Sequence, residues 1–178
     1  MSRTYRIKLG LEEVTLHGNA LLLPVTLSHI LPGEDMKALL RDKLRSAGWG
    51  DGEQGYRIAL RTDSSTSVLA ELNEALDTLQ IRLADRTVAI TQERLTAEQR
   101  AKADRGEPFS PEELQAIAGP SDSEVAQAVA SARGALNKVL AEVYKEAVLQ
   151  KAQQLGVVES IQESESAHGT RLRITVNG

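Results

Sequence analysis

Cysteine is absent from this sequence, and aromatic residues are scarce. Without cysteine the chain has no disulfide bond, no thiol nucleophile and no thiolate metal site. Aromatic residues make up only 3% of the 178 residues, so the clustered aromatic side chains on which single-stranded nucleic acid stacks are missing. The core must therefore be built from aliphatic and alanine side chains.

The sequence also lacks an excess of positive charge and a long apolar run. Its net charge is −4, and no block of Lys and Arg supplies the positive surface that binds phosphate backbones. No stretch reaches the roughly 18 consecutive apolar residues that span a bilayer, and the first residues carry no apolar signal segment. These absences predict a cytoplasmic protein with neither nucleic acid nor membrane as a partner.

No motif of catalysis or metal binding stands out. The three histidines, His17, His29 and His168, lie far apart, and none has a metal-ligand spacing. His17 and His168 adjoin glycines in predicted turns, whereas His29 is predicted to be a partly buried structural residue. Ser64 and Ser65 lack the Gly-x-Ser-x-Gly context of a nucleophile elbow. The sequence therefore predicts no catalytic residue, no cofactor and no metal site, and favours a binding or scaffolding component over an enzyme.

Alternating apolar and polar residues predict several short strands. Strands are expected over 4–11, 20–27 and 56–61. Pro24 assigns the second of these to a sheet edge or a bulge, because proline cannot donate to a strand ladder. Residues 68–79 fit either a helix or a strand by their spacing, and we favour the strand. Two further runs, 79–83 and 88–90, flank a turn at 84–86 and predict a hairpin.

Helix signals occupy the rest of the chain. A helix is expected over 34–47, stopped by Gly48. A Ser or Thr followed three residues later by Glu or Gln marks an N-terminal capping box. Such boxes occur at Thr96 with Gln99, Ser110 with Glu113 and Ser121 with Glu124. The last of them opens a proline-free stretch that predicts one helix over 122–155, ended by Gly156.

These signals together predict an α+β fold. Its sheet is mostly antiparallel and packs against helices, and the long C-terminal helix is followed by a terminal β-hairpin over 157–163 and 171–176. A chain of this length is of single-domain size, so residues 1–178 are expected to form one domain. Within it, 95–121 is expected to be a polar helical connection, with a short helix in a mobile segment at 103–120.

The long helix gives the clearest hint of a partner. Its apolar positions recur in alternating steps of four and three, as in a coiled coil, although packing across the sheet is the simpler explanation of this spacing. A helix of about 50 Å exceeds strands of about 20 Å, so part of it should protrude or pair with another chain. Trp49 is either a core residue, which we favour, or an exposed anchor. The predicted partner-binding residues are Trp49, Leu136, Val139 and Val143.

Three blocks of sequence look familiar. They are the opening residues 1–8, the stretch from His29-Ile30-Leu31-Pro32 to Gly48-Trp49, and the stretch from Glu146-Ala147 through Lys151-Ala152-Gln153-Gln154-Leu155-Gly156 to Ile161. They resemble a family of small bacterial proteins found in predicted ternary systems with an AAA+ ATPase and a von Willebrand factor A protein. The resemblance implies an accessory component with these two proteins as partners, and it implies no site residue.

Three functional hypotheses follow. The first is a non-catalytic adaptor that binds protein partners, within such an AAA+ ATPase and von Willebrand A system. The second is a small-molecule-binding protein or enzyme with a pocket between sheet and helices, using His29 or a pair of carboxylates. The third is a structural homodimer or other homo-oligomer formed through the long helix.

Overall fold

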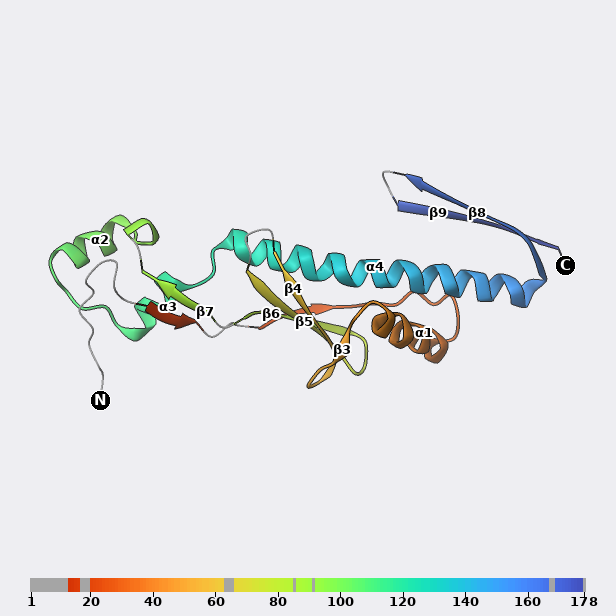
Figure 1. The fold of residues 1–178 in the computed structure, drawn as a ribbon, viewed down its shortest axis with the longest axis horizontal. Coiled ribbons are helices and arrows are strands. Elements are labelled where there is room, and N and C mark those ends of the chain that lie inside the picture. Colours follow the sequence, from red (N-terminus) through yellow and green to blue (C-terminus); the bar gives the residue numbers. More distant parts are fainter. Residues whose placement is uncertain are drawn as a thin grey trace.

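The computed structural model describes residues 13–16, 20–62, 66–84, 86–90, 92–166 and 169–177. The strand expected over 4–11 and the residues His17, Ser64, Ser65 and His168 lie outside these ranges. The described part has the predicted α+β fold. It is elongated, and helix α4 (Asp122–Leu155) runs along most of its length (Figure 1).

Five strands of the described part form one antiparallel sheet with the order β2-β6-β5-β4-β3. They are β2 (Ala20–Pro24), β3 (Gly50–Asp51), β4 (Gly55–Arg61), β5 (Ser67–Asn73) and β6 (Thr78–Leu83). Strand rather than helix is confirmed for residues 68–73, which belong to β5, whereas residues 74–77 form the turn into β6. Pro24 ends the edge strand β2, where its missing N–H removes no interior ladder bond.

The hairpin expected over 79–83 and 88–90 is wrong. Strand β7 (Arg86–Ala89) pairs with β1 (Glu13–Leu16) in a separate two-stranded sheet. Both neighbours of β6 are already present, because β2 lies on one side of it and β5 on the other. The alternating pattern was correctly read as strand, but it carried no information about which strand would be the partner.

The helices begin and end where local signals predict. Helix α1 (Gly33–Ser46) stops before Gly48, whose φ of 85° suits glycine. The predicted capping boxes are present at the starts of α2 (Ala97–Asp104), α3 (Pro111–Ala118) and α4. Gly156 follows α4, and β8 (Val157–Ser166) pairs with β9 (Gly169–Asn177) in the predicted terminal hairpin.

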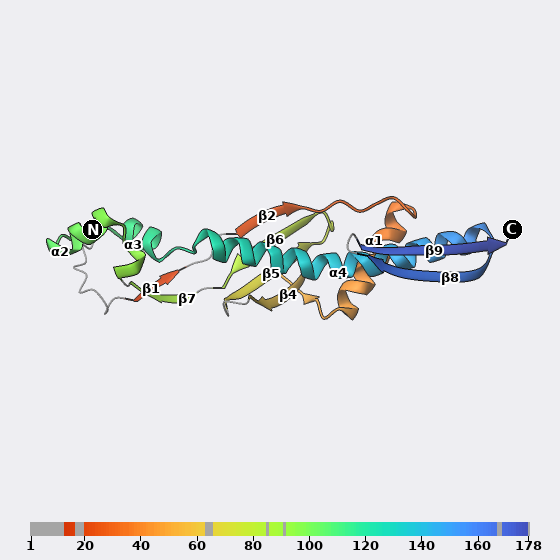
Figure 2. The ribbon, with the colours of Figure 1, turned by 90° about the horizontal axis from the view of Figure 1, so that it is seen from above.

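The main core lies between the sheet, α1 and α4. Figure 2 shows α4 crossing the sheet, with α1 beside it. Three residues of α1, Met36, Leu40 and Leu44, are almost fully buried. They join a cluster with Val68, Ala70, Leu72, Leu79, Ile81, Ala132, Leu136, Val139 and Val143. The apolar side of α4 therefore packs on its own sheet and on α1, which was one of the two interpretations of its spacing.

A second cluster of buried side chains lies at the other end of the molecule, beside α2 and α3 (Figure 1). Its members are Ile90, Leu95, Phe109, Leu114, Ile117 and Ala118. The ring of Phe109 is fully buried, and the amino group of Lys102 lies 4.9 Å from its centre. The same amino group donates to Glu113 at 2.7 Å. The segment between 95 and 121 thus contributes a small core of its own, which we call the second cluster.

This ion pair makes the stability of the second cluster depend on pH. The hydrogen bond from Lys102, together with the backbone of Ser110, lowers the pKa of the Glu113 carboxyl. A lowered pKa in the folded state stabilises the fold above the unfolded-state pKa and loses that effect as pH falls through the folded-state pKa. We expect the Glu113→Gln variant to lose less of its free energy of unfolding than the native chain does when the pH falls, because glutamine does not titrate and still caps the helix. Urea unfolding at neutral and acidic pH measures this difference.

The neighbouring carboxylate is the control. Glu112 stands in the same first turn of α3 and is exposed, so Glu112→Gln should leave the acid dependence close to that of the native chain. Identical pH profiles for the two variants would contradict a role for the Lys102–Glu113 pair.

Candidate functional site

The four predicted partner-binding residues lie in the main core. Trp49 is 2% exposed, which confirms the core interpretation that we favoured for it. Leu136, Val139 and Val143 on α4 are 4%, 3% and 0% exposed. In this arrangement they face the sheet and α1, so their proposed contact with a partner stays a prediction. A partner that approaches the folded chain meets other residues first.

A groove runs between α1, α4 and β4, and we call it the α1–α4 groove. It has a volume of about 480 Å³. Its apolar wall is formed by Trp49, Ile58, Ala135 and Val139, and polar groups come from Lys43, Ser46, Lys138 and Glu142. This groove lies between sheet and helices, where the small-molecule hypothesis places a pocket.

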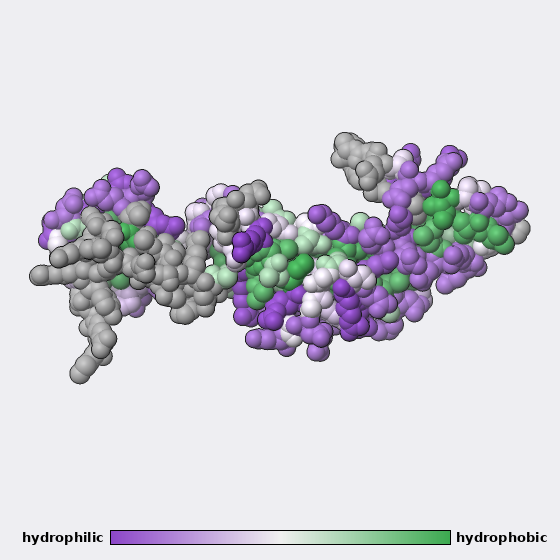
Figure 3. Space-filling model, viewed as in Figure 1, coloured by the Kyte–Doolittle hydropathy of each residue, from purple (hydrophilic) through white to green (hydrophobic). Residues whose placement is uncertain are grey.

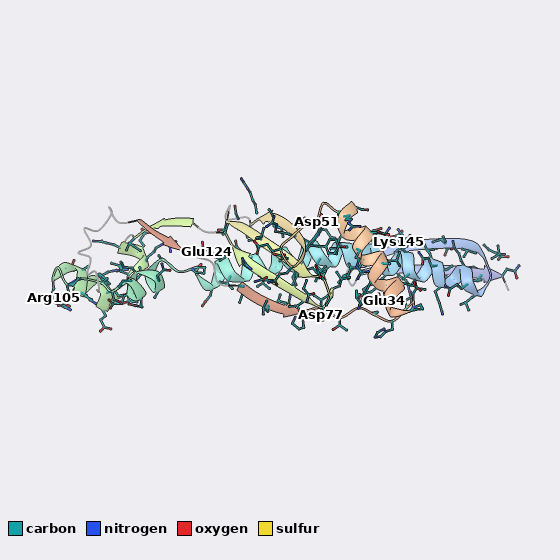
Figure 4. The ribbon with its side chains drawn as sticks, turned by 90° about the horizontal axis from the view of Figure 1, so that it is seen from below. Glu34, Asp51, Asp77, Arg105, Glu124 and Lys145 are labelled. Atoms are coloured by element: carbon teal, nitrogen blue, oxygen red, sulfur yellow. The ribbon has the colours of Figure 1, made fainter. Side chains whose placement is uncertain are left out.

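The titratable residues do not gather at one place. His29 is exposed, so its prediction as a partly buried residue is wrong. The apolar neighbours Leu27 and Ile30 pack against the main core in its place. Among the described residues no group of three or more His, Asp or Glu side chains could hold a metal ion. Figure 4 shows its six labelled charged side chains spread along the molecule rather than around a cleft.

One buried carboxylate escaped the sequence analysis. Glu71 on β5 is only 6% exposed and accepts a hydrogen bond from the backbone N–H of Gln54 at 2.6 Å. The loop between β3 and β4 folds over it, and Gly52 approaches so closely that a Cβ atom there would collide with the carboxylate. Glu71 thereby fixes this loop against the sheet. In sequence it looks like any polar residue on the outer face of a strand.

Three large apolar residues are exposed at the junction of α4 and the hairpin. Leu155 is 69% exposed, Val157 73% and Ile161 50%. We call this set the C-terminal surface. Figure 3 shows a hydrophobic region in this part of the molecule, where α4 passes into β8. Exposed apolar side chains that gather on one part of a surface are a common mark of an interaction site.

The hairpin is fixed to α4 by a few specific contacts. Lys145 of α4 (Figure 4) donates to Glu163 of β8 at 2.6 Å, and this hydrogen bond raises the pKa of Lys145. At the junction, Gly156 lies against the carbonyl of Asn177, leaving no room for a side chain. An isolated two-stranded hairpin is marginally stable in water, so these contacts hold the strands in place while their apolar residues remain uncovered.

No helix in the described ranges combines the length and the apolar character needed to cross a membrane.

Comparison with known protein families gives one match, which covers nearly the whole chain. The family model described as "FtsH ternary system domain X5" matches residues 1–177. No curated protein and no solved structure matches the chain.

Proposed function

The chain belongs to the FtsH ternary system domain X5 family, and on this premise we propose that it is a non-catalytic adaptor that binds a protein component of an FtsH-containing system. FtsH is an AAA+ protease, and the family description implies association with a system that contains it. The sequence resemblance to an AAA+ ATPase system agrees with this. A von Willebrand A protein, which the same resemblance implies, is proposed as a second partner.

The observation that carries the proposal is the C-terminal surface. Leu155, Val157 and Ile161 are three of the five large hydrophobic residues that are exposed in the described part. They lie at the end of α4 and on the hairpin that the Lys145–Glu163 contact holds against it, so we expect their positions to be set before binding. Burying them against a partner would remove apolar area from water at little cost in ordering.

The proposal predicts that a double variant, Leu155→Lys with Ile161→Lys, loses the partner. Charged groups at the centre of an apolar interface must be desolvated, so we expect at least about a tenfold rise in Kd. The measurement is isothermal titration of the purified chain with the FtsH protease of the same system, and in parallel with the von Willebrand A protein.

The matched control is Leu22→Lys. Leu22 is 66% exposed on β2, far from the hairpin, so this substitution places one lysine at a leucine about as exposed as Leu155 and should leave Kd unchanged. The adaptor proposal fails if neither protein binds the native chain, or if the double variant and the control bind equally well.

Light scattering of the chain alone separates the adaptor from a structural homodimer. Both use an exposed apolar surface, but a homodimer needs no other protein. A dimer that dissociates in the Leu155→Lys, Ile161→Lys variant would assign the C-terminal surface to self-association. We expect a monomer, because the apolar side of α4 is already occupied by its own sheet.

A further inference from the structure

The outer edge of β4 is only partly paired. Strand β3 covers Tyr56 and Arg57, and no other strand in the described part pairs with this edge. Backbone groups of successive strand residues point to opposite sides. The carbonyl of Gly55 accepts from Gly52 in the β3–β4 turn, whereas the carbonyl of Gln54 accepts from Glu74 beyond β5. The backbone N–H and C=O groups of odd-numbered residues therefore face outward, and no described residue bonds to those of Ala59 and Arg61.

The α1–α4 groove lies beside this edge. Ile58 of β4 is one of its walls, and Ala135 and Val139 of α4 form the opposite side. A strand added next to Ala59 and Arg61 would direct every second side chain toward α4, where the groove offers apolar walls and space. Figure 3 shows hydrophobic surface over the middle of the molecule, where β4 and α4 meet.

The other face of the same edge carries two exposed arginines, Arg57 and Arg61, of which Arg57 stands directly opposite the buried Glu71 of β5. Arg57 and Arg61 point away from α4 and are exposed, and neither forms an ion pair with another described residue. Cross-strand neighbours of opposite charge stabilise a pair of strands, and like charges destabilise it. An acidic side chain on the added strand would stand next to these guanidinium groups.

We propose that the outer edge of β4 binds an extended acidic peptide segment of a partner protein, in which apolar residues alternate with Asp or Glu. The segment continues the line of β3, and its backbone pairs with Ala59 and Arg61. Its apolar side chains enter the α1–α4 groove, and its carboxylates face Arg57 and Arg61. This mode of recognition draws affinity from backbone hydrogen bonds and specificity from alternate side chains. It uses a surface distinct from the C-terminal surface.

The probe is a synthetic peptide of about ten residues that alternates valine and glutamate. Its control is a peptide of the same length that alternates valine and lysine. In fluorescence anisotropy titrations the acidic peptide is expected to bind at least about tenfold more tightly than the basic one. Amide hydrogen exchange gives the position, because Ala59 and Arg61 should exchange quickly in the free chain and slowly with the peptide. The backbone N–H of Leu60 points toward β5, so it should exchange slowly both with and without the peptide.

Two variants test the geometry and the charge separately. Ala59→Pro removes an outward N–H that no described strand uses, a substitution that edge strands tolerate, and should lower affinity at least about tenfold. The double variant Arg57→Glu with Arg61→Glu should prefer the basic peptide. The Leu155→Lys, Ile161→Lys variant should bind the acidic peptide normally, so failure of the adaptor proposal and failure of this one remain distinguishable.

Several results would overturn the proposal. One is a native chain that binds neither peptide or both equally. Another is an Ala59→Pro variant that folds and binds as the native chain does. Slow exchange of Ala59 and Arg61 without peptide would mean that another segment of the chain already occupies the edge. Self-association that Ala59→Pro abolishes would assign the edge to a second copy instead.

Discussion

Replacing Phe109 by alanine is expected to lower the free energy of unfolding by about 4 kcal/mol. Phe109 is fully buried in the second cluster, where it is the largest side chain. Its removal takes away apolar burial and the ring beneath Lys102, and leaves a cavity among Leu95, Leu114 and Ile117 if the surroundings do not collapse. Urea unfolding followed by far-ultraviolet circular dichroism gives the value, and Phe109→Leu, which keeps most of the volume, should cost clearly less.

The same variant tests whether the chain is one domain. Trp49 is the sole tryptophan of the sequence and lies in the main core, remote from Phe109. Its fluorescence therefore reports the main core alone. If residues 1–178 form one cooperative domain, as we expect, the Trp49 transition shifts together with the circular dichroism. If the midpoint of the Trp49 transition stays at the urea concentration measured for the native chain, the second cluster unfolds independently of the main core.

Replacing Gly55 by alanine should cost about 3 kcal/mol. A Cβ atom at this position would overlap the backbone carbonyl of Leu72 and crowd the peptide between Asn73 and Glu74. All of these are main-chain atoms, so the clash can be relieved only by moving β4 and β5 apart at the start of their ladder. The loss should appear in thermal and urea unfolding of the whole main core.

Gly50 is the matched control for this substitution. It lies on the adjacent strand β3, and no atom would come within 4 Å of a Cβ placed there. Gly50→Ala should therefore change the free energy of unfolding by less than about 0.5 kcal/mol. Equal effects at the two glycines would show that backbone freedom, rather than the close approach to Leu72, determines the cost.

The helices could be predicted because their signals are local. Ser121 and Glu124 satisfy each other's backbone groups across three residues, so the start of α4 is written in adjacent sequence. The same holds for its end at Gly156. Strand faces were equally accessible, since alternation places apolar side chains toward the core.

Strand partners and local strain could not be predicted in this way. The pairing of β7 with β1 joins segments far apart in sequence, and nothing in either segment names the other. Leu76 adopts a φ of 63°, unusual for leucine, in the turn between β5 and β6. It is 2% exposed, so burial in the core sets its backbone against the local preference. The conformational propensity of leucine therefore does not predict this backbone conformation.

The candidate surfaces illustrate the same limit. Helical periodicity selected Leu136, Val139 and Val143. Such spacing marks the buried side of a helix but does not tell whether the chain's own core or a partner buries it, and here it is the core. Leu155, Val157 and Ile161 occupy ordinary positions at a helix end and in a strand. Their exposure depends on how far the hairpin stands from the rest of the chain, which only tertiary structure defines.

The length of α4 sets the distance between the two ends of the molecule. Its 34 residues hold the C-terminal surface about 50 Å from the start of the helix near α3. Each added turn lengthens the helix by about 5.4 Å, and each added residue rotates the following chain by about 100° about the helix axis. Lengthening α4 by whole turns would move a bound partner outward without turning it, whereas half a turn would aim it at the opposite side. Spacing and orientation between the two ends of the molecule are therefore set by a residue count.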